Sequence, residues 1–326
     1  MSIRTLKIAV AALAAALSLA SQPVAAQGAA AKPIRLGALK GPSGIGLIRL
    51  FEAPPSLPGG AALEAIAVPS ADVMTAKLVS GEYELATLPL NVAAKLRSAG
   101  IPVTLAAVIG DGMVKLLSAD PAFASLADLK GKELYVAGQG ATPDYLVRRL
   151  LKEAGLDPDK DLRLSYSLPY PEMAAALAAG KISYAVLPEP FATVATMANP
   201  GLKAPVDLGA LWTKATGQVS YPMTALVATE RFAAERPEAL RAILAAAKDS
   251  LAWVKADPAA AGLLVEKHEL GLKAPVAAKA IPRSAYVYVP APTARPAVEA
   301  LLKVFLETAP ASVGGKLPDG AFYGAY

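Results

Sequence analysis

Apolar residues follow two alternating patterns from residue 32 onward, either in short runs or recurring every three to four positions. The short runs predict strands and the spaced patterns predict amphipathic helices. In the first part of the chain, strands are expected at 34–39, 63–68, 83–88 and 103–109, and helices at 44–52, 72–79 and 91–98. Each strand is followed by a helix after a short connection, which is typical of an α/β protein with largely parallel sheets.

A second set of elements follows a short capped helical turn at residues 125–132. The pattern predicts strands at 133–137, 162–168 and 183–187, with helices at 142–154 and 172–179. A last strand is expected at 224–229, and further helices near 237–255, 258–270 and 295–308. The middle of the chain therefore repeats the architecture of the beginning.

The length of 326 residues exceeds the roughly 250–300 residues that one hydrophobic core usually holds, so we expect two lobes. No Gly-, Ser- or Pro-rich linker separates them, which favours a chain that crosses between the lobes twice. The expected crossings lie near 117–123 and 220–223. Residues 27–118 and 223–326 would then form a discontinuous first lobe, and residues 119–222 the second.

The first 26 residues have the composition of a secretory signal peptide. Arg4 and Lys7 precede an apolar run from Ile8 to Ala20, and small residues around Pro23 lead to Ala26. This run is shorter than the roughly 20 residues that span a bilayer, so cleavage after Ala26 is expected. We therefore predict a soluble, periplasmic mature protein that is not inserted in the membrane.

The composition excludes several kinds of chemistry. There is no cysteine and only one histidine, His268, which argues against zinc or iron–sulfur sites, thiol nucleophiles and histidine-based triads. Arg4 and Lys7 belong to the leader, so 30 basic residues face 27 acidic ones in the remainder. These basic residues are scattered, and we expect no nucleic-acid partner, no metal, no cofactor and no catalytic residue.

The strongest candidate ligand loop joins the first strand to the first helix and has the sequence Lys40-Gly-Pro-Ser-Gly-Ile-Gly46. Loops at the carboxyl ends of strands meet ligands in open α/β folds, where free N–H groups at helix starts favour anions. The predicted contacts in this loop are Lys40, Ser43, Gly44, Ile45 and Gly46. The alternative is an ordinary turn before a helix.

A second loop with the same position in the other lobe runs from Gly138 to Asp144 and opens the predicted helix 142–154. Thr142 is the expected cap and Pro143 follows it, so this loop also has the alternative of a plain helix cap. The predicted contacts are Gly138, Gln139, Gly140, Ala141 and Thr142.

Further candidates follow the remaining strands. Leu90 and Asn91 come after strand 83–88, and Glu189 stands between two prolines after strand 183–187. Glu189 would either accept a hydrogen bond from an amine ligand or bind its own lobe. Tyr170 and Tyr221 would stack on a ligand or donate hydroxyl groups, with core or hinge packing as the alternative.

Four segments carry a resemblance to a known family: Ser125-Leu-Ala-Asp-Leu-Lys-Gly-Lys132, Ala175-Ala-Leu-Ala-Ala-Gly-Lys-Ile-Ser-Tyr-Ala-Val-Leu-Pro-Glu-Pro190, Arg236-Pro-Glu-Ala-Leu-Arg-Ala-Ile-Leu-Ala-Ala-Ala247, and Gly314-Gly-Lys-Leu-Pro-Asp-Gly-Ala-Phe-Tyr323. Taken in order, they resemble the type 2 periplasmic solute-binding proteins of ABC importers. The chain is most similar to the group that binds nitrate, sulfonates, taurine and thiamine precursors.

The resemblance implies two α/β lobes, each a mostly parallel sheet flanked by helices, that close on a ligand around two hinge crossings. It also implies a monomer that delivers a small solute to the permease of an ABC importer. Lys40 and the paired helix starts favour an organic or inorganic anion, whereas the tyrosines and Glu189 favour a heteroaromatic amine such as a pyrimidine precursor. A receptor that feeds a sensor is a further alternative.

An enzyme similar to the thiamine pyrimidine synthases is a weaker alternative. The resemblance implies that such an enzyme needs an active-site histidine, a lysine for pyridoxal phosphate and a cysteine-rich motif. This chain has no cysteine, and His268 lies far along the sequence from the candidate loops.

Overall fold

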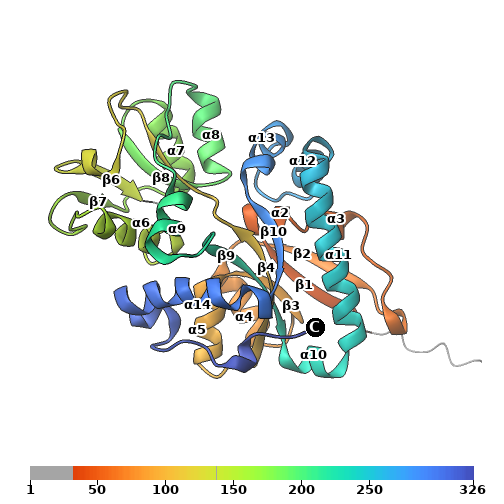
Figure 1. Ribbon diagram of the computed structural model, residues 1–326. Coiled ribbons are helices and arrows are strands. Elements are labelled where there is room, and N and C mark those ends of the chain that lie inside the picture. Colours follow the sequence, from red (N-terminus) through yellow and green to blue (C-terminus); the bar gives the residue numbers. More distant parts are fainter. Residues whose placement is uncertain (1–31, 137) are drawn as a thin grey trace, which may run out of the picture.

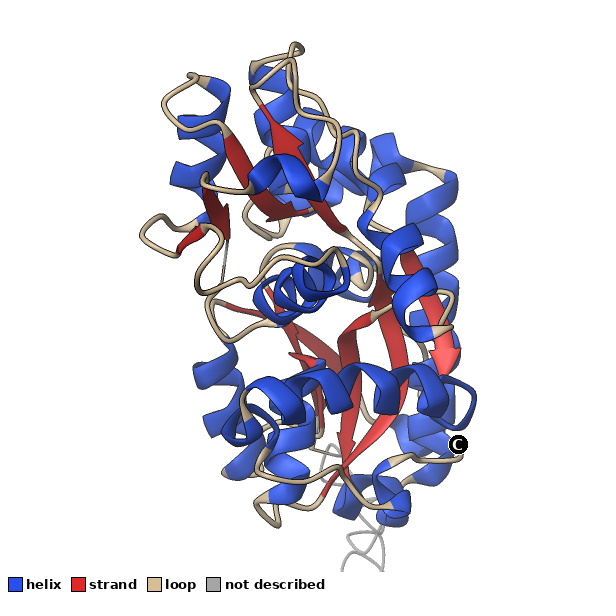
Figure 2. Ribbon diagram, turned by 60° about the vertical axis from the view of Figure 1, so that its left-hand side comes forward, coloured by secondary structure: helices blue, strands red, loops and turns tan. Residues whose placement is uncertain are grey.

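The computed structural model describes residues 32–136 and 138–326. The expected signal peptide and its cleavage site after Ala26 lie outside the described residues. The described chain forms two lobes, each with its own sheet and helices on both faces (Figures 1 and 2). None of the helices in this part of the chain is both long and apolar enough to cross a membrane.

The first lobe contains a sheet with the strand order β10-β4-β9-β3-β1-β2. β1, β2 and β3 pair in parallel, while β9 runs antiparallel to both β3 and β4, and β10 antiparallel to β4. The strand bounds are β1 Ile34–Leu39, β2 Leu63–Val68, β3 Leu85–Pro89, β4 Val103–Asp111, β9 Pro222–Thr229 and β10 Tyr286–Pro290.

Alternate residues of these strands point to two layers of helices. Leu226 packs toward the layer that contains α3, α11, α12 and α13, and its neighbour Val227 packs toward the layer of α4, α5 and α14. The bounds are α2 Pro42–Ile45, α3 Ile48–Glu52, α4 Ala71–Val79, α5 Leu90–Ser98, α10 Glu230–Glu235, α11 Pro237–Ala256, α12 Pro258–Lys267, α13 Ala274–Ala280 and α14 Ala291–Thr308.

The second lobe has a smaller sheet with the order β5-β8-β6-β7. Leu187 packs against α7 and α8, and the adjacent Val186 belongs to the layer of α6 and α9. The bounds are β5 Val114–Ser118, β6 Glu133–Val136, β7 Arg163–Ser165, β8 Tyr184–Pro188, α6 Thr142–Glu153, α7 Tyr170–Ala178, α8 Phe191–Ala198 and α9 Leu208–Thr216. Short 3₁₀ helices lie at Pro58–Gly60, Leu126–Leu129, Ile281–Arg283, Pro310–Val313 and Gly320–Phe322.

The first crossing between the sheets lies earlier than the sequence suggested. β4 ends at Asp111 in the large sheet, and β5 begins at Val114 in the small one, where it pairs with β8. The expected boundary at residue 118 instead placed β5 in the first lobe. The chain returns from the second lobe directly into β9, which agrees with the expected crossing near 220–223.

The sheets are also more mixed than the expected parallel arrangement. β4 leads the chain out of the first lobe and β9 brings it back, and the two are hydrogen-bonded neighbours. A strand that returns must run against the strand that leaves, so β9 is necessarily antiparallel to β4. The sequence pattern predicted a strand at 224–229, where β9 lies, but gave no sign that this strand runs antiparallel to its neighbours.

Most of the other predicted elements are present. The structure also contains several elements that were not predicted. The predicted helix 44–52 is divided into α2 and α3, and α8, α9 and β10 were not expected. α8 is rich in threonine, valine and alanine, a composition that favours neither state strongly. The expected capped turn at 125–132 is confirmed, since the Asp128 carboxylate accepts the Ser125 N–H at 2.8 Å.

Candidate functional site

A cavity of about 270 Å³ lies between the lobes at the carboxyl ends of β1, β2 and β3. The first lobe, the second lobe and the hinge strands all contribute to its walls. The lining residues are Leu39, Lys40, Pro42, Ser43, Pro69, Ser70, Ala71, Pro89, Met113, Ala141, Thr142, Pro143, Tyr170, Pro188, Phe191, Met223 and Thr224. We call this cavity the cleft.

Helix N-termini from both lobes converge on the cleft. α4 begins there in the first lobe behind its cap Ser70, whose hydroxyl accepts the Val73 N–H. α6, α7 and α8 begin there in the second lobe, with Thr142, Tyr170 and Phe191 as their first residues. The unpaired N–H groups and the dipole at a helix start favour negative charge, so the cleft has the polarity that suits an anion.

The charged and hydroxyl side chains of the lining support the same polarity. Lys40 is the single charged residue among the lining residues of the described chain, and it is solvent-exposed. The Ser43 and Thr224 hydroxyl oxygens are 3.4 Å apart, which joins the first loop to the returning hinge strand. The cleft therefore combines one positive charge with hydroxyl groups and has no carboxylate on its described walls.

The rest of the lining is apolar and aromatic. The rings of Tyr170 and Phe191 lie with their centroids 5.2 Å apart and their planes inclined by 34°, and Met113 and Met223 lie on the hinge side. Burial raises the pKa of Tyr170, so its hydroxyl stays protonated and can donate a hydrogen bond. This surface can hold the carbon skeleton of an organic molecule.

Gly138 makes room for this aromatic surface. A Cβ at Gly138 would lie 2.7 Å from the Tyr170 hydroxyl, and its φ of +76° is a conformation that glycine adopts readily. Gly138, Gln139 and Gly140 are not among the residues that line the cleft. Within this loop, the Gly140 N–H instead donates to Asp144 at 2.9 Å, which fixes the start of α6.

The structure brings together Lys40, Ser43, Ala141, Thr142 and Tyr170 of the predicted site residues. The other predicted residues of the first loop, Gly44, Ile45 and Gly46, are buried behind it. A Cβ at Gly44 would lie 2.4 Å from the Leu39 carbonyl oxygen, and one at Gly46 would lie 2.5 Å from Leu251. These glycines permit close packing beneath the cleft.

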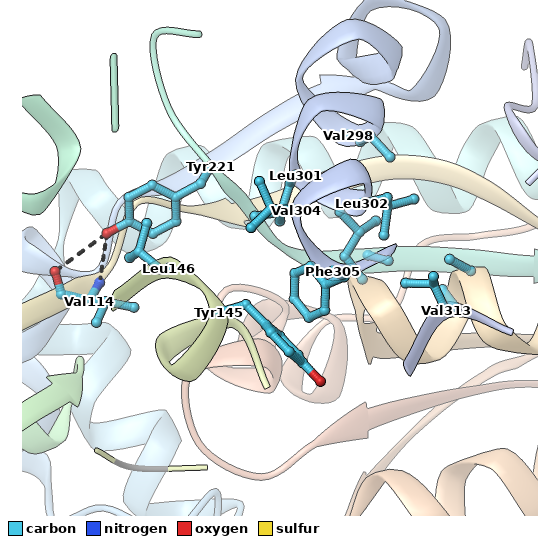
Figure 3. Packing of buried hydrophobic residues seen from close by; sticks show 14 of the residues in the cluster. Val114, Tyr145, Leu146, Tyr221, Val298, Leu301, Leu302, Val304, Phe305 and Val313 are labelled. Atoms are coloured by element: carbon cyan, nitrogen blue, oxygen red, sulfur yellow. Dashed lines mark hydrogen bonds between the residues drawn. The ribbon is translucent and has the colours of Figure 1, made fainter. Parts of the chain in front are cut away.

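The structure places four other predicted residues outside the cleft lining. Leu90 and Asn91 are buried in the first turn of α5, and Pro89 faces the cleft in their place. Tyr221 is fully buried, and its hydroxyl lies 3.4 Å from the backbone N and O of Val114 (Figure 3). Its ring also packs edge-on against Trp212. Glu189 is 2% exposed, accepts the Thr193 N–H at 3.1 Å and lines a different cavity.

Sequence reasoning missed several lining residues: Ser70, Met113, Phe191, Met223 and Thr224. Ser70 and Phe191 each stand close behind a strand end, as the predicted loops do, so the same signal was present there. Met113, Met223 and Thr224 lie where the chain crosses between lobes. Their position depends on the pairing of β4, β5 and β9, which the local pattern does not specify.

Comparison with models of known protein families identifies a match for this chain. A model of the NMT1-like family matches residues 58–266. The chain belongs to the NMT1-like family. A search of curated proteins found no match to this chain.

Solved structures share the fold over most of the chain. An ABC transporter structure from Parabacteroides distasonis is 30% identical with a TM-score of 0.78, over 90% of this chain and 99% of that one. The periplasmic aliphatic sulphonate-binding protein of Escherichia coli is 19% identical with a TM-score of 0.68, over 89% and 90% of the two chains. The periplasmic nitrate-binding protein of Synechocystis PCC 6803 is 19% identical with a TM-score of 0.53, over 73% and 66%.

The two-lobed fold predicted from the resemblance to periplasmic solute-binding proteins is thereby confirmed.

Proposed function

We propose that this protein is an exported solute-binding protein that captures a small organic anion in the cleft and delivers it to an ABC importer. The observation that carries the proposal is the position of Lys40, the one charged residue of the described lining, opposite the first residues of α6, α7 and α8. Positive charge from one lobe and helix dipoles from the other suit one acidic group held between them.

Within the class of anions, the lining favours an organic one. A bare oxyanion would leave the Tyr170–Phe191 pair and the two methionines without a partner, whereas a carbon skeleton would bury them. We assign the acidic group to Lys40, Ser43 and Thr142, and the skeleton to Tyr170 and Phe191. Aliphatic sulphonates, the ligands for which two of the fold relatives are named, carry an anionic group on a carbon chain.

A flat heterocycle such as a pyrimidine is the second candidate ligand, because two aromatic rings stand side by side on the second lobe. The main sequence argument for an amine was Glu189, and this carboxylate lines another cavity. A heterocycle would therefore bind through stacking and hydroxyl groups alone. We rank it after the organic anion for this reason.

A binding role is preferred to catalysis because the only histidine is not among the residues that line the cleft. His268 lies at the end of α12, and its Nε2 is 2.8 Å from the Glu52 carboxylate on α3. The fold relatives include binding components of import systems, which supports export and an importer permease as the partner. Amino-terminal sequencing of the exported protein tests the predicted cleavage after Ala26.

The test of the proposal is a thermal-shift panel on protein that has been unfolded and refolded to remove bound solute. The panel contains alkanesulfonates, taurine, nitrate, dicarboxylates and aminopyrimidines. A ligand at 100 times its Kd stabilises the folded state by about 2.7 kcal/mol, which raises Tm by roughly 4 °C in a protein of this size. We expect a shift with organic anions, whereas a shift confined to aminopyrimidines would support the second candidate, and no shift would contradict both.

A further inference from the structure

A second cavity, of about 570 Å³, also lies between the lobes. The second lobe contributes β5, the start of α8 and the segment before α9, and the first lobe contributes the segment that follows α13. The lining residues are Gly112, Val114, Lys115, Leu117, Glu189, Ala192, Thr196, Ala204, Val206, Asp207, Leu208, Gly209, Pro282, Arg283 and Ala285. We call it the hinge cavity.

The hinge cavity and the cleft lie on opposite sides of the same crossing strands. Met113 and Pro188 line the cleft, while their sequence neighbours Val114 and Glu189 line the hinge cavity. Successive residues of an extended chain point to opposite sides, so the two cavities are separated by the backbone of the hinge. The two lining sets share no residue, and a ligand in one cavity does not contact the other.

Glu189 is an incompletely partnered acid on the wall of the hinge cavity. It is 2% exposed, and its Oε2 accepts the Thr193 N–H at 3.1 Å, whereas Oε1 has no hydrogen-bond donor among residues 32–136 and 138–326. No lysine or arginine of the described chain forms an ion pair with it within 4.0 Å. Buried carboxylates are normally paired, because an unpaired buried charge is costly.

Two hydroxyl groups beside Glu189 are also unpartnered. The Thr193 Oγ1 and the Tyr286 Oη are buried without a hydrogen-bond partner in the described structure. Burial raises the pKa of Tyr286, the Ser284 hydroxyl opposes this effect, and the nearby Glu189 carboxylate adds to it. Of these three residues, Glu189 is the one that lines the hinge cavity, and its carboxylate can accept a hydrogen bond from an ammonium group there.

Basic side chains line the same cavity from both lobes. Lys115 comes from β5 of the second lobe, and Arg283 comes from the first lobe, where its side chain reaches Thr196 across the gap at 3.4 Å. Burial raises the pKa of Glu189, and the Thr193 N–H and the charges of Arg283 and Lys115 oppose this effect. An acidic group of a ligand would find two cations here, while the carboxylate of Glu189 is free for a positive group.

We propose that the hinge cavity is a second ligand site, which binds a small zwitterion with its ammonium group at Glu189 and its acid group at Lys115 and Arg283. The chemical class is that of the amino acids, in which the two charges are joined by a short carbon chain. Ala192, Val206 and Leu208 supply the apolar surface for that chain. This proposal is independent of the ligand assigned to the cleft.

Isothermal titration calorimetry with ω-amino acids of increasing length, from glycine to 6-aminohexanoate, tests the proposal on the full mature chain. We expect saturable binding of at least one member, and no binding of its matched controls that lack the ammonium or the acid group, such as butyrate and butylamine for γ-aminobutyrate. Absence of binding across the series, or equal binding of a one-charge control, would overturn the proposal.

Variants locate the site. Glu189→Gln keeps an acceptor for the Thr193 N–H and removes the charge, and Arg283→Ala removes an exposed basic side chain. Each should weaken binding roughly 10- to 100-fold. Lys40→Met in the cleft should leave it unchanged. If Lys40→Met abolishes binding and Arg283→Ala does not, the zwitterion occupies the cleft and the hinge cavity is not a ligand site.

Discussion

The rings of Tyr145 and Phe305 meet across the two lobes, with their centroids 4.3 Å apart and their planes inclined by 53° (Figure 3). Tyr145 belongs to α6 of the second lobe, and Phe305 to α14 of the first. Both side chains are buried, and they belong to one apolar cluster that continues from lobe to lobe. The lobes are therefore joined by packed side chains as well as by the hinge strands.

Phe305→Ala should destabilise the protein by about 3–5 kcal/mol, because it removes a fully buried ring and leaves a cavity between α6 and α14. Urea unfolding followed by circular dichroism measures this. Leu263→Ala on the exposed face of α12 is the matched control and should change stability by less than about 0.5 kcal/mol. A loss below about 1 kcal/mol for Phe305→Ala would show that the contact between lobes contributes little.

Lys40→Met should weaken binding of an anionic cleft ligand roughly 10- to 100-fold, because a charge-assisted hydrogen bond contributes about 1.5–3 kcal/mol. The ligand is the anion that gives the largest thermal shift, and calorimetry gives the Kd. Lys95→Met, on an exposed part of α5 away from the cleft, should bind with the affinity of the unaltered protein. Equal losses in both variants would point to general electrostatics rather than to a contact.

Asp111→Asn should make the protein more stable at neutral pH and have no such effect near pH 3. Burial at the end of β4 raises the pKa of Asp111 above its ordinary value of 3.8, while Ser220 and the Gly112 N–H act in the opposite direction. At a pH between the ordinary pKa of the unfolded state and the raised pKa of the folded state, the folded state holds a proton that the unfolded state releases. The stability contributed by Asp111 is therefore complete below about pH 3.8 and is lost as the pH rises through the raised pKa.

Denaturant unfolding from pH 3 to pH 8 measures this difference between the variant and the unaltered protein. Asp128→Asn is a control for which the effect on stability should change with pH in the opposite direction. The Ala124 and Ser125 N–H groups lower the pKa of Asp128. The contribution of Asp128 is present above its ordinary pKa and is lost as the pH falls. A stability difference for Asp111→Asn that does not change with pH would refute the assigned cause.

Gly44→Ala should cost about 1–3 kcal/mol, because the added Cβ would lie 2.4 Å from the Leu39 carbonyl oxygen, which is backbone and can move little. Thermal unfolding measures the loss. Gly320→Ala is the control, since the nearest atom to a Cβ there is the end of the Arg295 side chain at 3.6 Å. Gly44 directly follows Ser43 in α2 and lies four residues from Lys40, so Gly44→Ala should also weaken ligand binding in the cleft.

The sequence by itself determined the elements that are regular in pattern. The strands at 34–39 and 63–68 and the helix from residue 237 were predicted close to their observed bounds, because burial on one face imposes a period that can be read locally. The position of Lys40, Ser43 and Thr142 was also predictable. These residues follow strands that point toward the ligand edge of the sheet, and a strand end is a local feature.

The tertiary structure decided what depends on pairing between distant segments. β9 inserts between β3 and β4, and this brings Met223 and Thr224 to the cleft beside Met113. Glu189 was assigned to the cleft from its place after a strand, yet it lines the hinge cavity, whereas Pro188 lines the cleft. One residue along an extended chain reverses the side to which a side chain points, and only the packing of both lobes around the hinge gives each side its own cavity.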